Sequence, residues 1–95
     1  MLLYSAAALE DLERLTNFLL ESDPMASAAT AELVMRGLDI LREHPLVGRP
    51  VAEDTRELVI SRGGTGYVAL YRYREDVDTA TVLGIRHQRE SGFGE

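Results

Sequence analysis

The sequence has no cysteine and no lysine. Without cysteine, the chain forms no disulfide and offers no thiolate as a nucleophile or metal ligand. Without lysine, amine general bases and Schiff bases are excluded, because all ten cationic residues are arginines, which stay protonated. No apolar run approaches the roughly 20 residues of a membrane span, and the N-terminus lacks the pattern of a signal peptide. We therefore expect a soluble cytoplasmic domain without a cofactor.

The charge is acidic and unevenly distributed. Ninety-five residues with a net charge of −6 predict a single domain over residues 1–95. Residues 1–54 contain ten acids against four arginines, whereas residues 55–95 contain six of each. Tight binding to a phosphate backbone depends on neutralising cations, so we expect no tight nucleic-acid binding by the chain alone. The arginines of the second half are instead candidate contacts for an acidic partner.

The first half has the pattern of two amphipathic helices after a short edge strand at Leu2–Tyr4. Ser5 and Asp23-Pro24 are signals for helix starts, and leucines recur at helical spacing at positions 9, 12, 15 and 19. We predict a first helix from Ser5 to about Glu21, with a solvated face at Glu10, Asp11 and Glu13. The second helix has an apolar stripe that includes Val34, Met35 and Leu38, with Ser27 off the stripe. The cluster from His44 to Pro50 ends it, and the two-residue link favours an antiparallel helix pair.

The second half alternates as strands do. We predict strands over 56–62, 67–74 and 79–87, joined by the glycine-rich segment 63–66 and the polar turn 75–78. Tyr67, Ala69, Tyr71 and Tyr73 point to one face of the middle strand. In the last strand, Leu83, Ile85 and His87 share one face, and Val82, Gly84 and Arg86 share the other. The predicted fold is α+β, in the order β-α-α-β-β-β, with the helix hairpin on one face of a small antiparallel sheet.

Few residues could carry chemistry. His87 beside Arg86 and Arg89 could exchange protons and hold a phosphate or carboxylate, or could be a strand-end histidine with solvated arginines. The tyrosine stripe could stack on bases, or could pack beneath the helices. The two histidines are separated by 43 positions, which gives no metal-ligand spacing. We therefore predict no metal site.

Several segments together resemble the RelE/ParE superfamily of bacterial type II toxins. The resemblance extends over nearly the whole chain and rests on Ala8–Leu12, Asp23-Pro24, Leu41–Pro50, Arg56–Val59, Gly66–Arg72 and Ile85–Glu90. It implies the same α+β fold and neutralisation by an antitoxin protein. RelE-like members cleave messenger RNA in the ribosomal A site, using lysines and arginines on the open sheet face. ParE-like members inhibit DNA gyrase and have no established hydrolytic centre.

The resemblance favours the ParE-like branch, a toxin of a plasmid stabilisation system with a ParD-like antitoxin and DNA gyrase as target. Val59, Ser61 and Val68 fall where the nuclease branch tends to carry two lysines and an arginine. The alternative is a RelE-like ribosome-dependent endoribonuclease (mRNA interferase), in which Glu57, Arg72 and His87 imitate the acid, arginine and late histidine of a second nuclease subgroup. A third possibility is a family member that has lost its toxicity and only binds its antitoxin. The predicted antitoxin- or target-binding residues are Arg56, Arg72, Arg86, His87 and Arg89.

Overall fold

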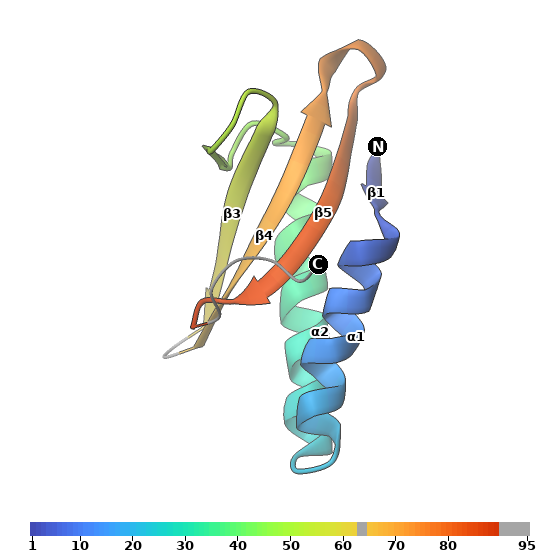
Figure 1. Ribbon diagram of the computed structural model, residues 1–95, viewed down its shortest axis with the longest axis vertical. Helices are drawn as coiled ribbons and strands as arrows, with labels where there is room; N and C mark the ends of the chain where they lie inside the picture. Colours follow the sequence, from blue (N-terminus) through green and yellow to red (C-terminus); the bar gives the residue numbers. More distant parts are fainter. Residues whose placement is uncertain (63–64, 90–95) are drawn as a thin grey trace.

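Two helices lie against one face of a five-stranded sheet in the computed structural model, which describes residues 1–62 and 65–89 (Figure 1). The helices are α1 (Ala6–Leu20) and α2 (Pro24–Asp39), and a 3₁₀ turn η1 (Ile40–Arg42) follows α2. The strands are β1 (Leu2–Tyr4), β2 (Arg49–Pro50), β3 (Thr55–Arg62), β4 (Thr65–Arg74) and β5 (Thr79–His87), with a turn η2 (Glu75–Val77) before β5. The predicted α+β class and helix hairpin are confirmed.

Local capping explains where the helices begin. The Ser5 hydroxyl accepts the N–H of Ala8 at 3.1 Å, and an Asp23 carboxylate oxygen accepts the N–H of Ala26 at 3.1 Å. Each bond satisfies one of the N–H groups that a helix start leaves without a partner. Pro24 occupies the first turn of α2, where its missing N–H costs nothing. Both predicted helix starts are confirmed.

The sheet has the order β1-β5-β4-β3-β2 and is mixed, not purely antiparallel as predicted. The β3–β4 and β4–β5 pairs are antiparallel, but β1 pairs with Ala80–Val82 of β5 in parallel. The two hairpin reversals after β3 give β5 the direction of β3, and β1 runs in that same direction beside β5. Strand β2, which was not predicted because Pro50 is typical of a turn, pairs with Arg56 and Glu57 at the opposite edge.

A bulge in β5 changes which side chains face the helices. Tyr71 lies opposite Val82 and Leu70 lies opposite Gly84, so Leu83 is the extra residue. Val82 is therefore fully buried on the helix side, and Leu83 is only partly buried. The prediction that Leu83 shares a face with Ile85 and His87 is therefore wrong. The prediction that Val82 shares a face with Gly84 and Arg86 is wrong as well.

The core lies between the helix pair and the sheet. Its largest fully buried side chains are Tyr71, Leu38, Leu41, Ile85, Val34 and Val82. Tyr67 is 5 % exposed and Tyr71 is completely buried, so base stacking by these rings is excluded and packing beneath the helices is confirmed. Ser27 was predicted to lie off the buried stripe, but it is buried. Its hydroxyl donates to the carbonyl of Thr16 at 2.8 Å and so links the two helices.

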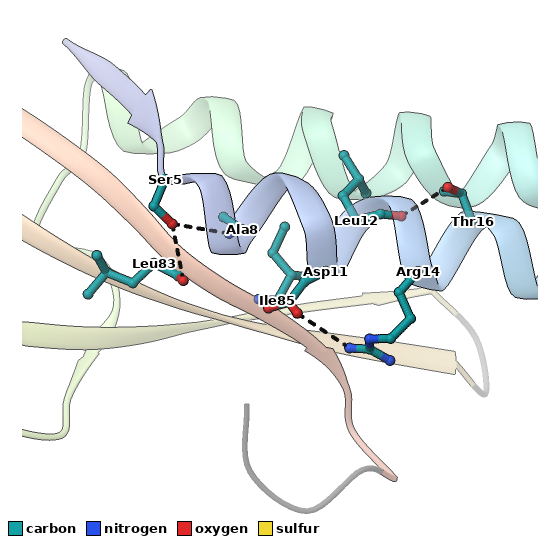
Figure 2. A network of polar contacts seen from close by, with 8 residues as sticks. All are labelled: Ser5, Ala8, Asp11, Leu12, Arg14, Thr16, Leu83 and Ile85. Carbon is teal, nitrogen blue, oxygen red and sulfur yellow. Dashed lines mark hydrogen bonds and ion pairs between the residues drawn. The ribbon is translucent and has the colours of Figure 1, made fainter. Parts of the chain in front are cut away.

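Ser5, which caps α1, and Asp11 of α1 cover the outer edge of β5 where β1 ends (Figure 2). The Ser5 hydroxyl donates to the carbonyl of Leu83 at 3.2 Å, and an Asp11 carboxylate oxygen accepts the N–H of Ile85 at 2.9 Å. The other Asp11 oxygen lies 3.7 Å from the Arg14 guanidinium. The prediction that Asp11 belongs to a solvated face is therefore wrong: it is 6 % exposed and supplies a partner to a backbone group that has no strand beside it.

Candidate functional site

The sheet face opposite the helices is the candidate site, because no helix covers it within residues 1–62 and 65–89 (Figure 1). Three strands contribute to it, since side chains directly opposite one another in register lie on the same face. Three rows cross this open face, namely Thr55, Arg72 and Thr81; Glu57, Leu70 and Gly84; and Val59, Val68 and Arg86.

The open face has an apolar centre with charged residues around it. Val59 is 57 % exposed there, next to the buried Val68. Glu57 forms an ion pair with Arg49 of β2, with 2.7 Å between the guanidinium nitrogen and the carboxylate oxygen. Arg72 forms one with Asp54 at 3.1 Å. An apolar centre surrounded by polar groups is the usual composition of a protein–protein interface.

Arg86 extends the charged border at the end of β5. Its terminal guanidinium nitrogen lies 3.4 Å from the carbonyl oxygen of His87 and 3.5 Å from that of Gln88. These contacts place the guanidinium beside the backbone at the end of β5, where its Nε is buried. The open face therefore presents Arg72 and Arg86 from neighbouring strands, together with Arg49 of β2 and Arg74 at the end of β4.

The structure does not bring Glu57, Arg72 and His87 together. Glu57 and Arg72 lie on the open face, but His87 lies opposite Tyr67 on the helix side of the sheet. The His87 and Tyr67 rings meet edge to face, with 5.3 Å between centroids and an interplanar angle of 87°. Because alternate residues of a strand point to opposite faces, the sheet itself separates His87 from the other two side chains.

The predicted binding arginines are also divided between surfaces. Arg56 is opposite the buried Tyr71, on the helix side, and its guanidinium donates to the carbonyls of Leu46 at 3.1 Å and Gly48 at 2.8 Å. Arg89 is exposed just after β5, and its backbone N–H donates to Nδ1 of His87 at 3.1 Å. Arg56 therefore fixes a loop, and among the predicted binding residues it is Arg72 and Arg86 that share the open face.

The loop between η1 and β2 is a feature that the sequence did not reveal. The Tyr71 hydroxyl accepts the N–H of Gly48 at 2.9 Å and donates to the carbonyl of Pro45 at 2.7 Å. A Cβ at Gly48 would lie only 2.6 Å from the Tyr71 ring and hydroxyl, so this close approach requires glycine. Burial raises the pKa of Tyr71 above its ordinary 10.0, against the lowering effects of the Gly48 N–H and of Arg56. The sequence indicated only a turn here.

Two further properties concern the part of the chain that the structure describes. No group of three or more histidine, cysteine, aspartate or glutamate side chains is placed there to hold a metal ion. None of the helices in that part is both long and apolar enough to cross a membrane.

Comparison with known proteins identifies similar toxins. The chain is 43 % identical over 70 residues to Toxin RelE1 of Caulobacter vibrioides, covering 74 % of this chain and 75 % of that protein. It is 34 % identical over 83 residues to Toxin RelE3 of the same species, covering 87 % and 88 %. Among solved structures, the toxin–antitoxin complex RelBE2 of Mycobacterium tuberculosis matches with a TM-score of 0.58 and 26 % identity, over 93 % of this chain and 96 % of that one.

The sequence profile for the ParE toxin of the parDE type II toxin–antitoxin system matches residues 2–92, which is nearly the whole chain. The match to the solved RelBE2 complex supports the same overall fold of helices on a sheet. This chain therefore belongs to the ParE toxin family, within the RelE/ParE superfamily of type II toxins.

Proposed function

We propose that this toxin acts by binding its target through the open sheet face, that the target is DNA gyrase, and that a ParD-like antitoxin neutralises it. Membership of the family supports the toxin role and an antitoxin partner. The composition of the open face supports binding over hydrolysis. The target itself is inferred from the ParE-like features of the sequence.

The observation that carries this proposal is the chemistry of the open face. Cleavage of RNA needs a group that moves a proton and cations that stabilise the developing charge. Val59 and Val68, which stand at two of the nuclease positions, supply neither. Glu57 is a carboxylate on this face, but its side chain is 15 % exposed and paired with Arg49. His87 lies on the other side of the sheet. The described open face therefore has apolar area and arginines for docking, without a histidine.

The antitoxin would use the same cations. Acidic residues of the antitoxin pair with Arg72 and Arg86, and its apolar side chains cover Val59 and the partly exposed Leu70. Burial of this apolar area contributes roughly 25 cal/mol per Å² before the costs of association are subtracted. Because Arg86 is only partly exposed and its Nε is buried, thermal melting of Arg86→Glu checks that this variant is folded before its binding is compared.

The direct test is a gyrase supercoiling assay with the purified toxin. We expect inhibition and accumulation of cleaved DNA, both reversed by the antitoxin. Arg86→Glu should weaken both antitoxin binding and gyrase inhibition, because the open face loses a cation. Arg36→Glu makes the same charge change on exposed α2 and is the matched control. Unchanged inhibition and antitoxin affinity in Arg86→Glu would count against the open face as the docking surface.

A second candidate function is ribosome-dependent RNA cleavage. Two of the relatives carry the name RelE, and the solved neighbour is a RelBE complex. In this function His87 is the general acid or base, with a neighbouring arginine stabilising charge. It predicts cleavage of ribosome-bound messenger RNA that His87→Ala abolishes. A toxin that leaves both gyrase and messenger RNA unaffected yet binds its antitoxin would be a member that has lost its toxicity.

A further inference from the structure

A second surface lies where α2 ends and β4 meets η2, at the end of the molecule away from the α1–α2 connection (Figure 1). It is an open depression, lined by Ile40, His44, Pro45, Leu46, Val47, Tyr73 and Glu75. Tyr73 alternates with Arg72 along β4, so its side chain lies on the helix side of the sheet. The depression is therefore separate from the open face.

The loop that forms one wall of this depression is held in place by the sheet. Tyr71 bonds to the backbone of Pro45 and Gly48, and Arg56 bonds to the carbonyls of Leu46 and Gly48. The N–H of Val47 also donates to the carbonyl of His44 at 3.2 Å. A wall that is fixed before a partner arrives reduces the ordering cost of binding.

This fixed wall presents aliphatic side chains to solvent. Leu46 is 59 % exposed, Val47 is 51 % exposed, and Ile40 across the depression is 44 % exposed. Single exposed aliphatic residues are ordinary, but adjacent ones around a concave surface are typical of interaction sites. Since the fold fixes this loop without burying its aliphatic side chains, they remain available to a partner.

The described residues that line the depression include one carboxylate, that of Glu75, and no arginine. Within residues 1–62 and 65–89, the nearby acids Asp39 and Asp76 form ion pairs with Arg42 and Arg74, and Asp78 accepts the hydroxyl of Tyr73. Glu75 forms no ion pair in this part of the chain, and it lines the depression. A partner group that combines apolar surface with a cation complements Leu46 and Glu75 together.

We propose that the antitoxin docks a basic apolar segment here, with an aliphatic or aromatic side chain on Leu46 and Val47 and a neighbouring lysine or arginine on Glu75. The proposal rests on the antitoxin part of the proposed function and is independent of the target. A second copy of this chain is a poor occupant, because it carries a net charge of −6. An antitoxin that reaches both this depression and the open face gains affinity from linkage of the two contacts.

The test measures the affinity of purified cognate antitoxin for toxin variants by isothermal titration calorimetry. Glu75→Lys and Leu46→Ser change exposed side chains, so the fold should persist, and thermal melting followed by circular dichroism checks this. We expect each to weaken binding by about tenfold or more, as loss of a contact at an interface centre does. Glu21→Lys makes the same charge change at the opposite end of the molecule and should leave the affinity within about threefold.

Salt dependence separates the role of charge from that of shape. The affinity of the unchanged toxin should fall more steeply with ionic strength than that of Glu75→Gln, because the proposed contact is between opposite charges. Antitoxin affinity that is unchanged in both Glu75→Lys and Leu46→Ser would overturn the proposal. It is equally overturned if these variants lose only gyrase inhibition, which would assign the depression to the target. If the unchanged toxin does not inhibit gyrase, the affinity test still holds, because it measures only antitoxin binding.

Discussion

Removal of the Tyr71 hydroxyl should lower the free energy of unfolding, because two backbone groups lose their hydrogen-bond partner. In Tyr71→Phe the ring stays in the core, but the N–H of Gly48 and the carbonyl of Pro45 lose their partner. The Gly48 bond is buried, and an unsatisfied buried donor costs about 1–3 kcal/mol. The Pro45 bond is only partly buried, so water can replace much of it. We therefore expect a loss of about 2 kcal/mol in the free energy of unfolding.

Urea denaturation followed by circular dichroism measures this loss, and thermal melting gives an independent value. For a domain of this size, about 2 kcal/mol corresponds to a fall in Tm of about 8–16 °C. The matched control is Tyr73→Phe, which removes an exposed hydroxyl bond to Asp78 and should cost about 1 kcal/mol or less. Equal losses in the two variants, or a Tyr71→Phe value within about 0.5 kcal/mol of the unchanged protein, would refute the reasoning.

Three further stability measurements by urea denaturation test other contacts. Asp11→Ala leaves the N–H of Ile85 without its acceptor and should lower the free energy of unfolding by about 1–3 kcal/mol. The control Glu10→Ala, on the exposed face, should change it by no more than about 0.5 kcal/mol. Similar losses in the two variants would contradict the assigned role of Asp11. Gly48→Ala forces a Cβ to 2.6 Å from the Tyr71 ring and should cost about 1–3 kcal/mol, and a neutral result would show that the loop can shift. Because burial raises the pKa of Tyr71 above 10.0, the folded state holds this proton more tightly than the unfolded state does. Stability should therefore be insensitive to this group below about pH 10 and fall above it, with a smaller fall in Tyr71→Phe; identical slopes would contradict this.

Local signals in the sequence predicted the elements well. Ser5, Asp23 and Pro24 act on the first turn of a helix, so their effect does not depend on the rest of the fold. The strands that became β3, β4 and β5 follow from residue alternation. The burial of Asp11 could not be predicted in this way, because it depends on a free N–H of Ile85, which is 74 positions away in the sequence.

The candidate site was only partly predictable for the same reason. Alternation within β4 puts Arg72 on the face opposite Tyr71, which the sequence indicates directly. The relation of Arg72 to His87 depends on how β4 and β5 pair, and the bulge at Leu83 changes that pairing within β5. The Gly48 loop was missed because its partners, Tyr71 and Arg56, belong to strands that follow it in the chain.

The most direct test of the central claim is a cleavage assay on messenger RNA held in the ribosomal A site. The claim is that the toxin acts by docking on a protein through the open face and does not cleave RNA. We predict that the purified toxin leaves the message intact, at a concentration that inhibits gyrase. Cleavage of the message that His87→Ala abolishes, with gyrase activity unaffected, would contradict the claim.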